Sequence, residues 1–376
     1  MSTSPMQAQT EPTRSTFGRL ITHHLDPWLT GLVMAVCAIG LVTLYSASDQ
    51  SLAMVIDQAE RLALGIVVML VVAQLTPEML RRSAPWLYGA ALLLLIAVLI
   101  LGDHSKGAQR WLIIGPLRFQ PSELMKLGMP LVIAAYLGAK SLPPSLGTTL
   151  SALGIILVPA ALIAVQPDLG TAVLVVAAGL LTLYFGGLRW RWILLALGIA
   201  AAVAPFIWFH LHDYQQQRLL TFFNPGRDPL GAGYHIIQSK IAIGSGGLWG
   251  KGWLMGTQAK LNFLPEANTD FIFSVYGEEM GLTGALVLLL LYVAIVGRCL
   301  VIAMRGQDSF QRLLAGALGM TFFVYVFINI GMVIGLLPVV GVPLPLVSYG
   351  GTSMVSLLAG FGMLMSVHTH RKLFTT

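Results

Sequence analysis

Long apolar stretches constrain this chain more than any other feature of its sequence. Ten of them, most close to 20 residues long, carry few charged side chains, and a stretch of about that length spans a bilayer as a helix. Charged residues make up 10% of the chain, against about 25% in soluble domains, so a soluble fold is excluded. The predicted spans are residues 28–47, 62–76, 86–102, 121–138, 148–165, 169–187, 190–209, 271–297, 313–336 and 347–367.

These stretches predict an all-α polytopic membrane protein with about ten transmembrane helices. The second span, 62–76, has a short apolar core, so nine spans are the alternative. Cys37 and Cys299 both fall inside apolar stretches, which indicates no disulfide framework. The net charge of +6 is modest and lies beside the spans, a pattern typical of contact with anionic lipid headgroups and not of nucleic-acid binding.

The distribution of lysine and arginine orients the predicted helices. If the N-terminus lies inside, the short segments on the inner side hold most of the basic residues, as the positive-inside rule requires. Both termini are then cytoplasmic. Residues 1–25 form a polar cytoplasmic tail, and residues 26–372 form a single transmembrane domain. One large extracytoplasmic loop, 210–270, joins helices seven and eight.

The loop 210–270 is far longer than a connection between two helices needs to be. Because it is rich in aromatic residues and glycine, we expect a folded cap with short amphipathic helices at the membrane interface. Its basic residues Arg218, Lys240 and Lys251 could hold a pyrophosphate, helped by backbone N–H groups of the glycine-rich run 244–252. The alternative is that the glycines serve only turns and the basic residues touch lipid headgroups.

Asp270 ends an acidic turn, 265–270, and is expected in the first turn of the eighth helix. An ionisable residue at the membrane boundary is a functional hypothesis by default. The alternative is that the acid caps the helix and is stabilised there by the helix dipole. Glu278 and Glu279 follow on the same helix. One of them should find a basic or hydrogen-bonding partner, as a structural contact.

Two further polar groups stand at the beginnings of predicted spans. Glu123 and Lys126 are three residues apart on one helix face, and both must face the bundle interior or a wet cavity. A structural ion pair is the alternative. Asp168 follows a very short outer turn, where helix capping is the alternative to a functional role.

The segment 335–352 is dense in proline and glycine and cannot form a regular helix. Irregular backbone at membrane depth is tolerated only inside protein or along a cavity. We therefore expect a re-entrant or broken segment that lines a site, with an ordinary outer loop as the alternative. The sequence contains no His/Cys metal cluster, no G-x-S-x-G elbow and no nucleotide-binding fingerprint.

The ordered motifs resemble those of the SEDS (shape, elongation, division and sporulation) family, over about residues 26–372. The GYHIIQSK block and PPSLGTT at 143–149 place the chain nearer the rod-shape, elongation members than the division members. The motifs that carry the resemblance are AQRW at 108–111, FQPSELMKL at 119–127, QPDLGTA at 166–172, GYHIIQSK at 233–240, TDFIF at 269–273 and GVPLPLVSYGG at 341–351.

The resemblance implies a peptidoglycan glycosyltransferase of cell elongation. Such an enzyme polymerises lipid II into β-1,4 glycan strands on the outer face of the cytoplasmic (inner) membrane, beside a class B penicillin-binding protein, a transpeptidase. Asp270 takes the position of the family's essential aspartate, and the sensitive positions fall on Arg110, Glu123, Lys126 and Asp168. One departure is Asn268, where a histidine is common.

The expected mechanism follows from this assignment. Asp270 acts as general base on the acceptor hydroxyl. Arg110, Lys126 and the basic residues of the loop compensate the leaving pyrophosphate, with Glu123 orienting Lys126 and Ser348 in the binding set. A divalent cation, Mg²⁺ or Mn²⁺, is another means of compensation, but the sequence defines no ligand set for it.

Two other functions fit parts of the pattern. A flippase or transporter of a lipid-linked saccharide would share the basic groove, but it would need charged residues through the full membrane depth and usually internal repeats. A structural scaffold would leave the intramembrane acids unexplained.

Overall fold

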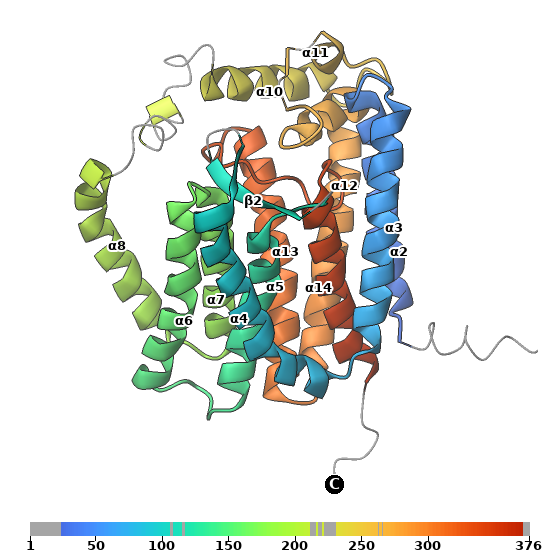
Figure 1. The fold of residues 1–376 in the computed structure, drawn as a ribbon. Coiled ribbons are helices and arrows are strands. Elements are labelled where there is room, and N and C mark those ends of the chain that lie inside the picture. The colour runs from blue at the N-terminus through green and yellow to red at the C-terminus, as the bar shows by residue number, and fades with distance from the viewer. Residues whose placement is uncertain are drawn as a thin grey trace, which may run out of the picture.

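Helices make up most of the described chain, and they stand side by side in an upright bundle (Figure 1). The computed structural model describes residues 24–105, 108–114, 117–210, 216, 220–221, 231–261, 263–264 and 266–370. The long helices in that part are α2 (Pro27–Ala47), α3 (Leu52–Gln74), α4 (Pro77–Leu101), α5 (Pro121–Gly138), α6 (Leu146–Val165), α7 (Leu169–Phe185), α8 (Trp190–His210), α12 (Ile272–Met304), α13 (Ser309–Val333) and α14 (Gly351–Thr369).

Six of these helices, α2, α4, α6, α12, α13 and α14, are long and apolar enough to cross a membrane by length and composition. Their exposed surfaces are apolar, with side chains such as Leu93, Leu157 and Leu290 more than half exposed. A bundle that exposes this much apolar surface requires lipid around it. The chain is therefore a multi-pass membrane protein.

Two helices begin well before the predicted spans. Helix α3 starts at Leu52 and α4 at Pro77, whereas hydropathy placed the spans at 62 and 86. The side chains of Ser51 and Thr76 cap these helices by accepting the backbone N–H of residues three positions on. Capping residues set where a helix begins, while hydropathy detects only its apolar part.

The expectation of an all-α chain was wrong between α4 and α5. Strands β1 (Asp103–Ser105), β2 (Ala108–Ile114) and β3 (Leu117–Phe119) form a small antiparallel sheet in the order β1-β2-β3. Leu112 pairs with Phe119 in its second ladder. Strands of three to seven residues are too short for the window of about 19 residues that detects spans.

The described part of the loop 210–270 folds as a cap. Helix α10 (Ala232–Gly246) and the short α11 (Thr257–Lys260) lie across one end of the bundle (Figure 1). The Ser239 hydroxyl on α10 donates to the carbonyl of Val333 at 2.5 Å and lies 2.8 Å from the Ser274 hydroxyl on α12. The prediction of a folded cap with short helices is confirmed for the described residues, whereas Arg218 lies outside them.

Buried acids on α12 fasten the cap to the bundle. The Glu278 carboxylate lies 2.6 Å from Lys251 Nζ and accepts the Thr257 N–H at 2.8 Å. The Glu279 carboxylate accepts the hydroxyl of Ser46 on α2. Helix α12 breaks just beyond them, at Gly281, whose φ is 64°. A basic or hydrogen-bonding partner was predicted for one of the two glutamates. The structure gives both of them such a partner.

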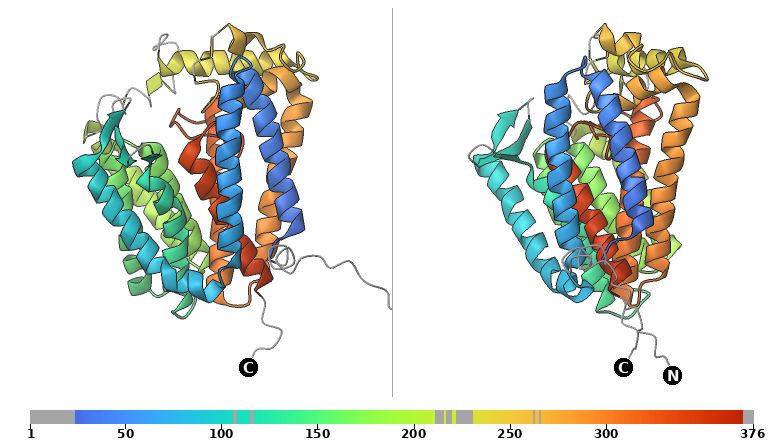
Figure 2. Two further views of the ribbon diagram at one scale, coloured as in Figure 1. Left: turned by 45° about the vertical axis from the view of Figure 1, so that its right-hand side comes forward. Right: turned by 90° about the vertical axis from the view of Figure 1, so that its right-hand side faces the viewer.

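The opposite end of the bundle brings the two ends of the described chain together. There, Asp26 caps α2 and forms an ion pair with Arg298 of α12 at 2.7 Å. The His24 ring stacks on His370, with the ring centroids 4.3 Å apart. Figure 2 shows the start of α2 and the end of α14 at this end, away from the cap.

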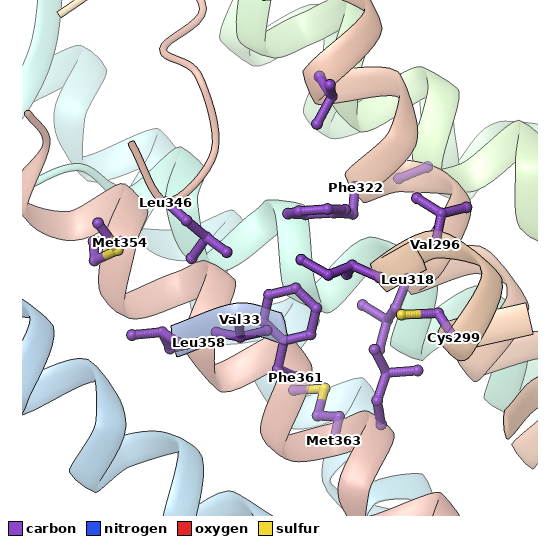
Figure 3. Close-up of a cluster of buried hydrophobic side chains, with 14 of the residues drawn as sticks. Val33, Val296, Cys299, Leu318, Phe322, Leu346, Met354, Leu358, Phe361 and Met363 are labelled. Atoms are coloured by element: carbon purple, nitrogen blue, oxygen red, sulfur yellow. The ribbon is translucent and has the colours of Figure 1, made fainter. Parts of the chain in front are cut away.

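Between the two ends, an apolar core joins helices that are distant in sequence. Phe322 of α13 meets Phe361 of α14 edge-on, with the ring centroids 5.2 Å apart (Figure 3). Met354, Leu358 and Cys299 line the same cluster. Close packing here fixes how α12, α13 and α14 sit against one another.

Glycine is required at position 250, where the cap meets α12. Gly250 has a φ of +80°, and a Cβ there would lie 2.1 Å from the carbonyl oxygen of Glu279. We expect Gly250→Ala to destabilise the protein by at least about 1 kcal/mol through backbone strain and the clash. The measurement is the thermal unfolding midpoint in detergent micelles.

The matched control is Gly244→Ala in the same cap. A Cβ at Gly244 meets no atom within 4 Å, and alanine favours a helix, so its unfolding midpoint should be unchanged or raised. Equal midpoints for the two variants would show that the cap does not press on α12 at Gly250.

Candidate active site

The turn that carries Asp270 is held by three consecutive backbone carbonyls. The carbonyl of Asn268 accepts the Tyr349 N–H at 2.9 Å, and that of Thr269 accepts the Ser348 hydroxyl at 2.6 Å. The carbonyl of Asp270 accepts the side-chain amide of Asn329 at 2.9 Å. The backbone beneath the Asp270 carboxylate is therefore fixed from two other parts of the chain.

Asp270 itself lies just outside α12, because Phe271 is the N-cap residue of that helix. The prediction that it lies in the first helical turn was wrong by this small margin. Its side chain is partly buried, and Oδ2 lies 3.5 Å from where a Cβ on Gly341 would be. Gly341, at a φ of +72°, keeps that space clear.

The proline- and glycine-rich segment forms no helix or strand between Val333 and Gly351, as predicted. Buried Gln58 of α3 donates to the carbonyl of Ser348 at 3.1 Å and accepts the Gly350 N–H at 3.3 Å. The Asn329 amide also donates to the carbonyl of Val342, at 2.7 Å. Side chains from two helices thus satisfy backbone groups that a helix would have satisfied internally.

The Ser348 hydroxyl links the irregular segment to the Asp270 turn. It accepts the Leu344 N–H at 2.7 Å and donates to the Thr269 carbonyl. The sequence placed Ser348 in the substrate-binding set. The structure gives its hydroxyl two protein partners and a direct link to the Asp270 turn.

Glu123 and Lys126 form a buried ion pair at the start of α5, with Nζ and Oε1 2.6 Å apart. Ser356 of α14 donates to the other Glu123 oxygen at 2.8 Å. The Lys126 ammonium lies 5.0 Å from the centre of the Tyr325 ring on α13. Each charge has a partner, and these contacts tie α5 to α13 and α14.

A small pocket lies between Tyr325 of α13, the irregular segment and the start of α14. Tyr325, Ser348 and Ser353 supply its polar lining. Tyr325 therefore faces Lys126 on one side and the segment that holds the Asp270 turn on the other.

Asp168 caps α7, where Oδ1 accepts the Thr171 N–H at 3.2 Å. Gln120 donates to its other oxygen at 3.1 Å, and Arg110 Nη1 lies 3.8 Å from Oδ1. Arg110 also donates to the carbonyl of Pro167. Strand β2 therefore delivers Arg110 to Asp168, an approach that the sequence alone did not indicate. The Arg110 side chain remains 31% exposed.

Lys240 and Lys251, the predicted pyrophosphate-binding residues that lie in the described cap, differ in their surroundings. Lys251 is engaged by Glu278. Lys240 is exposed on α10, and its Nζ is 2.6 Å from where a Cβ on Gly335 would lie, at the start of the irregular segment. Lys240 therefore faces that segment, while Lys251 holds the cap. Arg218 cannot be placed, as it lies outside the described residues.

The sequence reasoning missed four residues that build the site: Gln58, Arg61, Asn329 and Tyr349. The Arg61 guanidinium carbon lies 4.6 Å from the centre of the Tyr349 ring. Hydropathy placed Gln58 and Arg61 before the second span, although both are helical. Asn329 carried a usable signal, because a polar side chain deep in a predicted span is expected to have a partner.

The ion pair predicts a coupled stability effect. Lys126→Met leaves the Glu123 carboxylate buried and uncompensated, which should destabilise the protein by about 3–5 kcal/mol. The double variant Glu123→Gln/Lys126→Met should lose less than the sum of the two single variants. Thermal unfolding in detergent of the four proteins in this cycle measures the coupling, and strict additivity would contradict it.

Comparisons with known proteins agree with this architecture. A family model described as "Cell cycle protein", covering FtsW, RodA and SpoVE, matches residues 19–373. The chain is 52% identical to the peptidoglycan glycosyltransferase MrdB of Escherichia coli (strain K12), over 97% of this chain and 98% of that protein. It is 36% identical to a probable peptidoglycan glycosyltransferase FtsW of Escherichia coli O157:H7, over 93% and 87%.

Solved structures share the fold. A chain described under "Structural coordination of polymerization and crosslinking by a peptidoglycan synthase complex" has a TM-score of 0.82 and 33% identity, covering 93% of this chain and 99% of that one. The rod shape determining protein RodA of Thermus thermophilus has a TM-score of 0.70 and 32% identity, covering 92% and 98%. The resemblance seen in the motifs is confirmed: this chain belongs to the FtsW/RodA/SpoVE family of cell cycle proteins.

Proposed function

We propose that this chain is a peptidoglycan glycosyltransferase that polymerises lipid II into β-1,4 glycan strands during cell elongation, with Asp270 as general base. The relative MrdB has that activity in its name and aligns over nearly the whole of both chains. The observation that carries the site assignment is the bracing of the Asp270 turn by Tyr349, Ser348 and Asn329. Catalytic groups need such preorganisation.

The reaction requires one proton transfer and one displacement. The acceptor sugar's 4-hydroxyl loses its proton to the Asp270 carboxylate as its oxygen attacks the anomeric carbon of the donor. The bond from that carbon to the pyrophosphate oxygen breaks, and undecaprenyl pyrophosphate leaves with the electron pair. Direct displacement from an α-linked donor inverts the configuration of the anomeric carbon and gives the β-1,4 product.

The leaving pyrophosphate needs positive charge near it. Arg110 offers a partly exposed side chain, and Lys240 faces the irregular segment from the cap. Arg61 packs on Tyr349 next to the Asp270 turn and is a third cation that can compensate the pyrophosphate charge. Lys126 is already compensated by Glu123, so its part is to fix α5 and Tyr325.

The described residues do not fit a resident metal site. They contain no group of three or more His, Cys, Asp or Glu side chains that could hold an ion. In the proposed reaction the chain's own cations compensate the pyrophosphate. Removal of Mg²⁺ and Mn²⁺ with a chelator tests whether the reaction needs a divalent cation bound to the pyrophosphate.

The proposed placement puts the enzyme in the cytoplasmic (inner) membrane, with ten spans and both termini in the cytoplasm. The cap and the Asp270 turn then face the outer side. Support comes from the positive-inside distribution and from the His24–His370 stacking, which brings the two ends of the described chain together at the end of the bundle opposite the cap. A class B penicillin-binding protein is the proposed partner, because a solved relative is described as coordinating polymerisation with crosslinking in a complex.

Asp270→Asn tests the base directly. It removes the proton acceptor but keeps the size of the side chain and one acceptor oxygen, so lipid II polymerisation should fall by about 10²–10⁴-fold with unfolding unchanged. Gel analysis of glycan strands made by the purified protein, with its transpeptidase partner, measures this. Asp308→Asn is the control, since Asp308 caps α13 at the other end of the bundle and asparagine caps equally well.

Normal polymerisation by the Asp270→Asn protein would overturn the assignment. Movement of labelled lipid II across vesicles without any polymer would favour the flippase alternative.

Asn329→Leu tests the bracing of the turn. The leucine cannot donate to the carbonyls of Asp270 and Val342, so the turn should shift and polymerisation should fall by about 10²-fold, mainly in kcat. The control is Thr321→Val on the same helix, because the buried Thr321 hydroxyl has no hydrogen-bond partner among the described residues. Equal activities of the two variants would contradict a positioning role for Asn329.

A further inference from the structure

The cap exposes a concentrated apolar surface in residues 247–256, named here the tryptophan hairpin. Leu248 is 62% exposed, Trp249 81%, Trp253 46% and Met255 65%. Scattered exposed apolar residues need no explanation, but a contiguous group of large side chains marks an interaction surface. The mechanism proposed above uses none of these four side chains.

The hairpin sits where the exposed apolar surface of α12 begins. Residues 272–279 of that helix are all buried, and exposure starts at Leu282, which is 50% exposed. The Leu282 N–H donates to the carbonyl of Gly247 at 2.9 Å, and the Thr283 N–H to that of Leu248 at 3.1 Å. Trp249 therefore lies beside the point on α12 at which its exposed apolar surface begins.

The hairpin also lies at the end of the exposed apolar surface of α2. The Trp253 indole N–H donates to the carbonyl of Val42 at 3.3 Å, and the Trp253 ring lies 6.0 Å from that of Tyr45. Val42 is 47% exposed, whereas residues 43–47 are buried or partly buried. The hairpin thus borders the outward-facing apolar surfaces of two neighbouring helices at their common end.

The level of the hairpin is fixed by the fold. Lys251 in its middle is paired with the fully buried Glu278, and Gly250 packs directly on the backbone of Glu279. Glu279 is bonded in turn to Ser46 of α2. Because these contacts are buried, the exposed tryptophans are held in place and cannot fold back onto the cap without breaking an ion pair.

We propose that the tryptophan hairpin inserts into the headgroup region of the lipid leaflet on the cap side and anchors the cap to the membrane surface. The lipid is indicated by continuity, since the hairpin extends the apolar surfaces of α2 and α12, both apolar enough to cross a membrane. Tryptophan is the residue enriched at this boundary.

The inference is independent of the catalytic assignment to Asp270. It requires only that the cap end of α2 and α12 meets the membrane surface, so loss of the proposed activity would leave it standing.

The test places a bimane fluorophore on the hairpin of the full-length protein by Trp249→Cys. The native cysteines, Cys37 and Cys299, are buried and offer little to the label. In vesicles of phosphatidylcholine and phosphatidylglycerol with brominated acyl chains, the bimane should lose most of its fluorescence relative to unbrominated vesicles. Iodide in the water phase should quench it weakly.

Two further variants make the result decisive. Leu248→Cys should behave like Trp249→Cys, and it keeps the test open if the first variant labels poorly. Lys260→Cys, exposed on α11 in the same cap, should be quenched by iodide and not by brominated lipid. Strong iodide quenching at 248 and 249 would overturn the proposal, as would protection that appears only when a partner protein is bound.

Discussion

Three hydrogen bonds to consecutive carbonyls, at Asn268, Thr269 and Asp270, are the constraint on which the site depends. Their donors come from α13 and from the irregular segment before α14, so the turn is correct only when the bundle is assembled. The same segment has no secondary structure to satisfy its own backbone. Gln58 and Asn329 supply the missing partners, and each segment thereby stabilises the other.

Buried charge serves two purposes in this bundle. Glu278 and Glu279 are fully or almost fully buried and fasten the cap to α12 and α2. Glu123 and Lys126 compensate each other where α5 meets α13 and α14. In both places, an unpaired carboxylate in an apolar interior would cost several kcal/mol, which is why each one has several donors. The Asp270 carboxylate lies elsewhere, at a partly exposed turn in front of α12.

The long helices were predictable because an apolar stretch of about 20 residues has one stable conformation in lipid. The start of α5 at Pro121 and the break between α13 and α14 also followed from proline and glycine positions. The small sheet was missed, since its strands are short and its stability comes from pairing along a turn-rich stretch. The early starts of α3 and α4 were missed because a capping hydroxyl contributes nothing to hydropathy.

The sequence by itself determined the class of fold and the residue types of the site. It identified Asp270, Glu123, Lys126, Asp168 and Arg110 as charges that a membrane protein must either pair or use, because isolated charge is unstable in lipid. Only the tertiary structure decided which of them are paired. Lys251 meets Glu278 across 27 positions and Arg110 meets Asp168 across 58, and contacts at such separations leave no periodic signal in the chain. Asn329 became part of the site only when folding brought α13 beneath the Asp270 turn.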